Sequence, residues 1–228
     1  MGTSELAAAG VGAGDEVVLP SFGGSRVADA VLALGAVPVF ADIEPVGFCL
    51  DPAAAERAVT ARTAAVVPLA LFGQVPDRPG FAELSRRRQV PVVELGAEPG
   101  AASLAAARRR RLAAHLGARL TGLVTPEPLP GREHTYARYV VRVPGNGRPD
   151  RDAFRRALRA RGIAAEVPVP VPAHRVGPRR SGAWLPETER AAAEALALPL
   201  HEAMTRREVH RLVSACRALG GLVLEPAC

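Results

Sequence analysis

The sequence predicts an α/β protein, in which a doubly wound, mainly parallel sheet is followed by a small α+β lobe. Short apolar runs alternate with amphipathic stretches over the first hundred residues, which is typical of strand, helix, strand units. After these residues the composition changes to longer Ala- and Arg-rich stretches. A chain of 228 residues can bury one core plus a small second one. We therefore expect a reduced large domain over residues 1–101 and a small domain over 102–228.

The first half contains four apolar runs and three amphipathic stretches. Gly35 and the Asp51-Pro52 pair mark a helix end and a helix start. Because strands and helices alternate, we expect parallel pairing with right-handed crossovers. The expected strands are 16–20, 37–41, 64–70 and 90–94, and the expected helices are 25–34, one from 52 onward, and 79–88.

The second half reads as fewer and longer elements. Helices are expected over 102–120, 150–161 and 187–196, an alternating strand over 134–143, and an extended, proline-rich run over 162–172. Residues 173–184 form an irregular loop and 198–201 a turn. Thr205 and Glu208 have the spacing of a capping box and start the last helix.

The charge of the chain is unusual because it rests on arginine alone. The net charge is +6, and all 29 basic residues are arginine, which stays protonated and offers no amine nucleophile. Such usage is typical of GC-rich genomes, and we interpret it as mutational rather than functional. The run from Arg108 to Arg111 is read as a solvated helix face, with an anion site as the alternative.

Composition also limits the partners and the location. The basic residues are dispersed and only 4% of residues are aromatic, so we expect no nucleic-acid partner. Three cysteines without metal or redox spacing predict reduced thiols and no metal site. No signal peptide or apolar span is visible, so we expect a cytoplasmic protein without membrane contact.

Several short motifs follow one another along nearly the whole chain. They are 10–21 (GVGAGDEVVLPS), 38–44 (PVFADIE), 68–74 (PLALFGQ), 139–142 (YVVR), 161–164 (RGIA), 170–174 (PVPAH) and 198–201 (LPLH) followed by Thr205 and Glu208. In these motifs the chain resembles the DegT/StrS sugar aminotransferases. The resemblance implies the pyridoxal-phosphate (PLP) fold type I, amine transfer to nucleotide-linked keto sugars, PLP held on a lysine, and sites built across a dimer interface.

The residues that the family uses to hold PLP are replaced in this chain. The resemblance places Leu95 where the family has the aspartate that pairs with the cofactor ring, Glu98 where it has a glutamine, and Gly100 where it has a histidine. Gly23-Gly24 replaces a Thr-aromatic pair. The chain has no lysine, and the segment that would carry the PLP lysine after Gly100 is missing. We therefore expect a truncated member that uses no cofactor and does not transaminate.

Four residues are the candidates for chemistry without a cofactor. Glu94 and Glu98 follow one strand and could share a cleft, where repulsion would separate their pKa values into an acid and a base; the alternative is an exposed turn residue. His134 and His174 stand at positions resembling those near the family's substrate and are candidate general bases. The alternative for both histidines is a solvated or capping role.

Three further residues are candidate substrate contacts. Tyr136 and Arg138 would supply a hydroxyl and an anion clamp from one face of a strand, although Arg138 could equally face outward. Ser21 follows the first strand but lacks the context of a nucleophile elbow. The faint phosphate-binding pattern of residues 2–4 (GTS) leaves anion binding open.

Two hypotheses about function follow. The first is a PLP-independent enzyme that performs proton transfer, such as cyclisation, isomerisation or elimination, on a sugar-like or secondary-metabolite substrate. The alternative is a catalytically inactive pseudoenzyme that supports a complete aminotransferase or another enzyme of its pathway. Because the family's sites form between subunits, we expect a homodimer or a heteromer with a related enzyme.

Overall fold

The computed structural model describes residues 2–96, 103–144 and 151–220, and the chain divides into two compact units. The first unit comprises Met1–Glu98, Leu129–Arg132 and Val169–Ala192. The second comprises Pro99–Pro128, Glu133–Pro168 and Ala193–Cys228. The segments Leu129–Arg132 and Val169–Ala192 thus belong to the first unit, although they follow residues of the second unit in the sequence. The sequence predicted one domain boundary, between residues 101 and 102.

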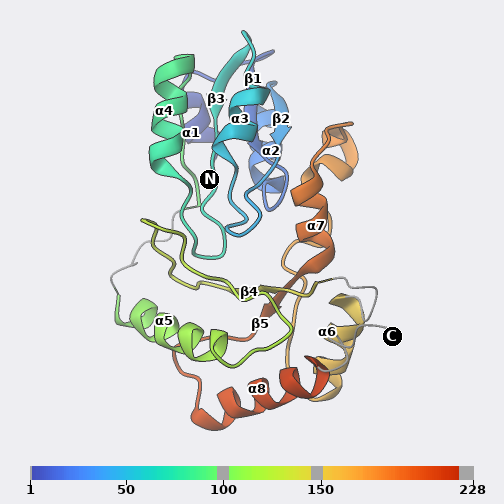
Figure 1. Cartoon of the computed structure of the whole chain (residues 1–228). Coiled ribbons are helices and arrows are strands. Elements are labelled where there is room, and N and C mark those ends of the chain that lie inside the picture. The colour runs from blue at the N-terminus through green and yellow to red at the C-terminus, as the bar shows by residue number, and fades with distance from the viewer. Residues whose placement is uncertain (1, 97–102, 145–150, 221–228) are drawn as a thin grey trace. The chain divides into compact units, whose positions relative to one another are not determined.

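The first unit is built on a three-stranded parallel sheet (Figure 1). Its strands are β1 (Glu16–Pro20) in the centre, β2 (Val37–Ala41) on one side and β3 (Thr63–Val66) on the other. Val17 pairs with Pro38, and Val18 pairs with both Val39 and Val66. All-parallel sheets need apolar side chains on both faces, and every residue of β1 is buried.

Helices cover both faces of this sheet, as a doubly wound fold requires. Val17 and Leu19 pack in one cluster with α1 (Thr3–Ala8) and α2 (Ser25–Ala33). Val18 packs in a second cluster with α3 (Pro52–Ala58) and α4 (Arg78–Arg88). Alternate residues of β1 therefore serve opposite cores, and the predicted fold class is confirmed for this half.

The fourth predicted strand, over residues 90–94, is present only in part. The amides of Val93 and Leu95 donate to the carbonyls of Val66 (2.9 Å) and Pro68 (3.1 Å), so the segment runs parallel to β3. Pro68 and Pro91 carry no backbone N–H, which prevents a continuous ladder. The prediction of the strand's direction is correct, but its regular pairing is interrupted.

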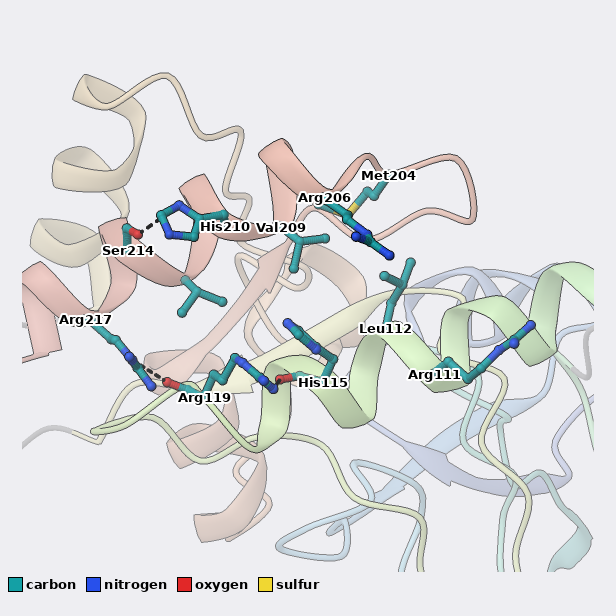
Figure 2. Close-up of a pocket in the computed structure, with 11 residues that line it drawn as sticks. Arg111, Leu112, His115, Arg119, Met204, Arg206, Val209, His210, Ser214 and Arg217 are labelled. Carbon is teal, nitrogen blue, oxygen red and sulfur yellow. Dashed lines mark hydrogen bonds between the residues drawn. The ribbon is translucent and has the colours of Figure 1, made fainter.

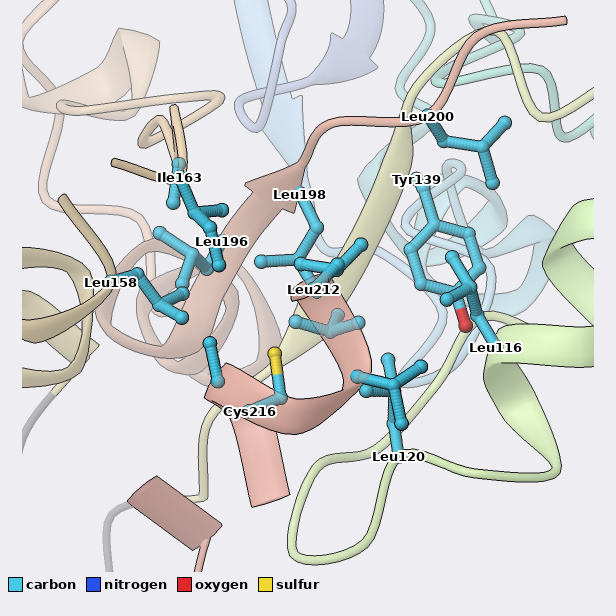
Figure 3. Close-up of a cluster of buried hydrophobic side chains, with 14 of the residues drawn as sticks. Leu116, Leu120, Tyr139, Leu158, Ile163, Leu196, Leu198, Leu200, Leu212 and Cys216 are labelled. Atoms are coloured by element: carbon cyan, nitrogen blue, oxygen red, sulfur yellow. The ribbon is translucent and has the colours of Figure 1, made fainter. Parts of the chain in front are cut away.

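In the described residues, the second unit has a two-stranded antiparallel sheet and three helices. The strands are β4 (Tyr139–Arg142) and β5 (Ala195–Leu198), with Tyr139 opposite Leu198. The helices are α5 (Leu104–Gly117), α6 (Arg151–Ala160) and α8 (Arg206–Gly220). Figure 3 shows the apolar core that they enclose, which includes Tyr139, Leu158, Leu196 and Leu212.

Two elements of the second half differ from the sequence-based expectation. The predicted strand over 134–143 is regular only in β4, because Tyr136 has a φ of 50° and turns the backbone out of the extended conformation. The helix predicted over 187–196 is shorter in the structure, where α7 spans Pro186–Glu194 and the next four residues form β5. Ala-Leu-Ala-Leu has good helix propensity, so pairing with β4 decides its conformation.

The residues between β4 and α7 add two short turns to the first unit. These are the 3₁₀ turns η1 (Ala173–Arg175) and η2 (Gly177–Arg179), which agree with the expected irregular loop. The predicted capping box is present, because the amide of Glu208 donates to Thr205 Oγ1 and the amide of Thr205 donates to Glu208 Oε2. Within the described residues, no helix is both long and apolar enough to cross a bilayer.

Candidate functional site at the strand ends of the first unit

The carboxyl ends of β1 and β2 lie at the edge of the sheet where doubly wound proteins bind their ligands. Ser21 follows β1 directly, and Asp42 follows β2. Both side chains are engaged by the segment 173–189 of the same unit. The chain itself thus supplies the groups that contact this edge.

Ser21 and His174, which are both buried, form a hydrogen-bonded line with the partly exposed Glu189. Ser21 Oγ and His174 Nδ1 are 2.7 Å apart, and His174 Nε2 lies 2.8 Å from Glu189 Oε1. The backbone amide of His174 also donates to Ser21 Oγ, at 3.0 Å. A proton on Nε2 facing the carboxylate leaves Nδ1 to accept from the serine hydroxyl, so both ring nitrogens and the hydroxyl have partners.

This Ser-His-Glu line joins chain segments and is closed to a substrate. Ser21 is 0% exposed and His174 2% exposed, so the hydroxyl cannot reach an attacking position in this conformation. The backbone adds to the closure, because the amide of Ala173 donates to the carbonyl of Ser21 at 3.0 Å. The predicted roles of Ser21 in substrate contact and of His174 as a base stay predictions, and both need this segment to move.

Asp42 holds the other end of the same segment. Its carboxylate accepts from the backbone amides of Glu187 (2.9 Å) and Thr188 (2.8 Å). These amides open helix α7, where the orphan N–H groups and the helix dipole favour a negative charge. Asp42 was not among the predicted site residues, although its position directly after an apolar strand was a usable signal.

Glu94 lies beside a guanidinium. Arg78 donates to both carboxylate oxygens of Glu94, at 2.7 and 2.9 Å, in a bidentate geometry. Glu98 lies outside the described residues, so its predicted pairing with Glu94 stays a prediction. A second bidentate pair joins Arg132 to Glu44, and the hydrogen bond to Glu44 raises the pKa of Arg132.

His134 and Tyr136 belong to the second unit and lie in its interior. The ring of His134 stacks on that of Tyr136, with centroids 4.0 Å apart, and His134 Nδ1 accepts from the amide of Tyr136 at 3.0 Å. Burial lowers the pKa of His134 to about 4, so the imidazole is neutral near pH 7 and is a weak base. Burial also raises the pKa of Tyr136.

Arg138 does not share the environment of Tyr136. Tyr136 is 5% exposed and belongs to the core, whereas the side chain of Arg138 is 41% exposed and donates to Glu166 at 2.8 Å. The expected common face required an extended strand, and the positive φ of Tyr136 removes that condition. The predicted substrate contacts of the two residues stay predictions.

The amino-terminal Gly-Thr-Ser pattern is occupied by a carboxylate of its own helix. Glu5 Oε2 accepts from the amide of Gly2 and from Ser4 Oγ, both at 2.8 Å. These donors would otherwise face an incoming anion. The hydrogen bonds also lower the pKa of Glu5, which keeps the carboxylate ionised.

The described residues do not fit PLP as a covalently held group. The chain contains no lysine. Leu95 packs against the apolar cluster of α1 and α2, where it offers no charge to a pyridine nitrogen. At Gly24, even a Cβ atom would lie 1.9 Å from the carbonyl oxygen of Pro20, so this turn cannot carry a ring over a cofactor.

A doubly wound sheet with a small α+β lobe and a ligand edge at the ends of β1 and β2 defines the class of aminotransferase-like folds. The DegT/DnrJ/EryC1/StrS aminotransferase family model matches residues 3–102 and 100–217. The chain therefore belongs to this family, and the predicted resemblance is confirmed.

Two curated relatives illustrate the match. One is L-glutamine:scyllo-inosose aminotransferase of Streptomyces griseus, 43% identical over 97 residues, which are 41% of this chain and 23% of that protein. The other is the pleiotropic regulatory protein of Geobacillus stearothermophilus, 29% identical over 286 residues, which cover 86% of this chain and 76% of that protein. This second alignment is longer than the whole chain, so the relative carries an internal segment that this chain lacks. The first match spans about a quarter of that relative's length.

The fold also matches solved structures. NtdA of Bacillus subtilis with bound cofactor PMP superposes with a TM-score of 0.86 at 20% identity, covering 96% of this chain and 71% of NtdA. At this identity the likeness shows the fold alone.

These comparisons correct three expectations. The prediction of a PLP-independent proton-transfer enzyme or inactive pseudoenzyme is wrong, because the relatives are named aminotransferases. The prediction that transaminase activity is absent is wrong for the same reason. The prediction of no cofactor conflicts with the family and with a neighbour that binds PMP. The error lay in reading lost residues of one chain as a change of chemistry.

Proposed function

We propose that this chain takes part in amine transfer to a keto-cyclitol or keto-sugar substrate, as a subunit that works with a lysine-bearing member of the same family. The substrate class is supported by the 43% identity over 97 residues to a scyllo-inosose aminotransferase. We include a second polypeptide because this chain has no lysine. PLP would be held by that partner's lysine.

The hydrogen bonds at the carboxyl ends of β1 and β2 support the proposal that this chain works with a second, lysine-bearing subunit. The Ser21-His174-Glu189 line and the Asp42 cap keep the segment 173–189 fixed on the first unit. Such a rigid edge suits a chain that presents a surface to another subunit, since it pays little ordering entropy on association. The aminotransferase chemistry is then a property of the assembly.

The test begins with the chain purified by an affinity tag from cells that make it naturally. We expect a second member of the family, identified by mass spectrometry, to co-purify and to show the visible absorbance of lysine-bound PLP. The chain alone, with PLP added, should not show the absorbance of lysine-bound PLP, because it contains no lysine. Recovery of unrelated proteins only would contradict the proposal.

A second measurement tests the function of the assembly. The captured family member is assayed with L-glutamine and scyllo-inosose, alone and with added chain at about 10 µM, which saturates an interface of micromolar affinity. We expect turnover per lysine-bearing subunit to rise or the preferred keto substrate to change. Unchanged kinetics at saturating chain would overturn the proposal, and amination by the chain alone would overturn the need for a partner.

A further inference from the structure

The second unit carries a basic groove between helices α5 and α8 that the proposed function does not use. Its volume is about 690 Å³. Figure 2 shows the side chains that line it, from α5 on one side and from α8 and the turn before it on the other. The lining residues are Arg111, Leu112, His115, Arg119, Met204, Arg206, Val209, His210, Val213, Ser214 and Arg217.

The charge on the groove has a single sign. Four of its residues are arginine and two are histidine, and within the described part of the chain no aspartate or glutamate lines it. Elsewhere many arginines lie against carboxylates, as Arg78, Arg132 and Arg138 do. Within residues 2–96, 103–144 and 151–220, the four groove arginines have no carboxylate within 4 Å. An adjoining hollow includes Glu202, which lies 3.7 Å from Arg109.

The arginines occupy both ends of the groove. In Figure 2, Arg119 and Arg217 lie near one end, and Arg206 lies toward the other with Arg111 beyond it. Arg119 donates to the carbonyl of His115, and Arg217 donates to the carbonyl of Arg119, so these bonds hold the pair at the end of α5. The helix rise of 1.5 Å per residue separates Arg111 from Arg119 by about 12 Å.

The floor of the groove is apolar. Val209 and Val213 belong to the buried core of the unit, and Leu112 and Met204 are half-buried against it. A site with an apolar floor and cationic ends favours a ligand that is apolar on one side and acidic along its length. Stacked bases are disfavoured because no Phe, Tyr or Trp side chain lines the groove within the described residues.

We propose that this groove docks an acidic amphipathic helix of a partner protein. Leu and similar residues spaced at i, i+3, i+4 and i+7 would lie on the floor formed by Leu112, Met204 and Val209. Glutamates or aspartates two or three turns apart would meet the arginines at the two ends, since three turns of helix span about 16 Å. This inference uses residues of the second unit only and does not rest on the proposed function.

The probe is a fluorescently labelled peptide of about 18 residues, long enough for a helix of five turns. It carries leucines at the spacing above and glutamates on both flanks. A matched peptide has lysine in place of every glutamate, and a second has the same composition with the amphipathic spacing scrambled. Binding to the whole chain is measured by fluorescence anisotropy. We expect the acidic amphipathic peptide to bind, more weakly as salt rises, and both control peptides to bind at least about tenfold less tightly.

Variants locate the site. The double substitution Arg111→Gln with Arg206→Gln should weaken binding about tenfold, and Met204→Gln should weaken it about threefold. The matched control is Arg156→Gln with Arg159→Gln on α6, which removes the same charge from exposed positions outside the groove and should leave the affinity unchanged. Circular dichroism checks that each variant is folded.

Four outcomes would overturn the proposal. They are equal weakening by the control double variant, equal binding of the scrambled peptide, tighter binding of a single-stranded oligonucleotide of equal charge, and no binding of the acidic peptide at low salt. The first would show a diffuse charge effect, and the third a nucleic-acid site in place of a protein-docking groove.

Discussion

Each compact unit buries one histidine that the sequence marked as a candidate base, and the two environments differ. His174 of the first unit has a hydrogen-bonding partner on each ring nitrogen, Ser21 and Glu189. His134 of the second unit accepts one backbone hydrogen bond and otherwise lies against an aromatic ring. Both units have apolar cores, but in the first unit a polar network around His174 also joins distant chain segments. Burial alone does not tell a bonded histidine from a merely enclosed one.

The largest effect is expected at His174. The substitution His174→Ala removes the two hydrogen bonds of the imidazole ring and leaves a cavity beside Phe40, which should lower the free energy of unfolding by about 4 kcal/mol. Urea denaturation followed by circular dichroism measures the loss. The control Glu189→Gln changes a half-exposed partner and should cost much less. Equal losses in the two variants would contradict the picture of a network centred on the imidazole.

The next effect separates His134 by its pH dependence. Its pKa is about 4 in the folded chain and 6.5 in the unfolded chain, so between these values only the unfolded chain takes up the proton. The effect of His134 on the free energy of unfolding is therefore absent above about pH 6.5, and it lowers that free energy by roughly 3 kcal/mol as the pH drops to 4. Denaturation midpoints from pH 7.5 to 4 should show this slope, and His134→Gln, which keeps an acceptor, should flatten it. An unchanged slope in His134→Gln would mean that other groups cause the loss.

A smaller effect is expected at Ser21. Ser21→Ala leaves Nδ1 and the amide of His174 without their partner in a buried place, which should lower the free energy of unfolding by about 2 kcal/mol. The matched control is Ser4→Ala, an exposed serine, which should cost less than about 0.5 kcal/mol. A loss at Ser21 no larger than the control would show that the serine is dispensable to the first unit.

The smallest effect tests the other anchor of the segment 173–189. Asp42→Ala removes the cap of α7 and should cost about 1 kcal/mol. Hydrogen exchange gives a sharper readout, because the amides of Glu187 and Thr188 should exchange faster while those of β4 do not change. Faster exchange throughout both units would point to general destabilisation and away from a local anchor.

The sequence predicted the parts of the fold that local patterns decide. The apolar runs gave β1 and β2 with their bounds, and Asp51 and Thr205 marked helix starts that the structure confirms. Strand β5 was missed because its Ala-Leu repeat suits a helix, and only its partner β4 makes it a strand.

The candidate site was less predictable because its bonds join residues far apart in the sequence. Ser21 and His174 were both singled out, but nothing in either motif indicated that the two would meet across 153 positions. Glu189 lies in an ordinary acidic helix turn and carried no signal. The sequence shows directly that the chain has no lysine. It contains no information about what a second polypeptide could supply.

A proline in the edge strand of the small parallel sheet has a consequence for aggregation. β2 is an edge strand of this sheet, and the amide of Val37 points inward to Asp15, so the nitrogen of the next residue, Pro38, faces outward without a hydrogen. An exposed strand that lacks a donor is a poorer template for another strand, so Pro38 guards this edge of the sheet against edge-to-edge aggregation.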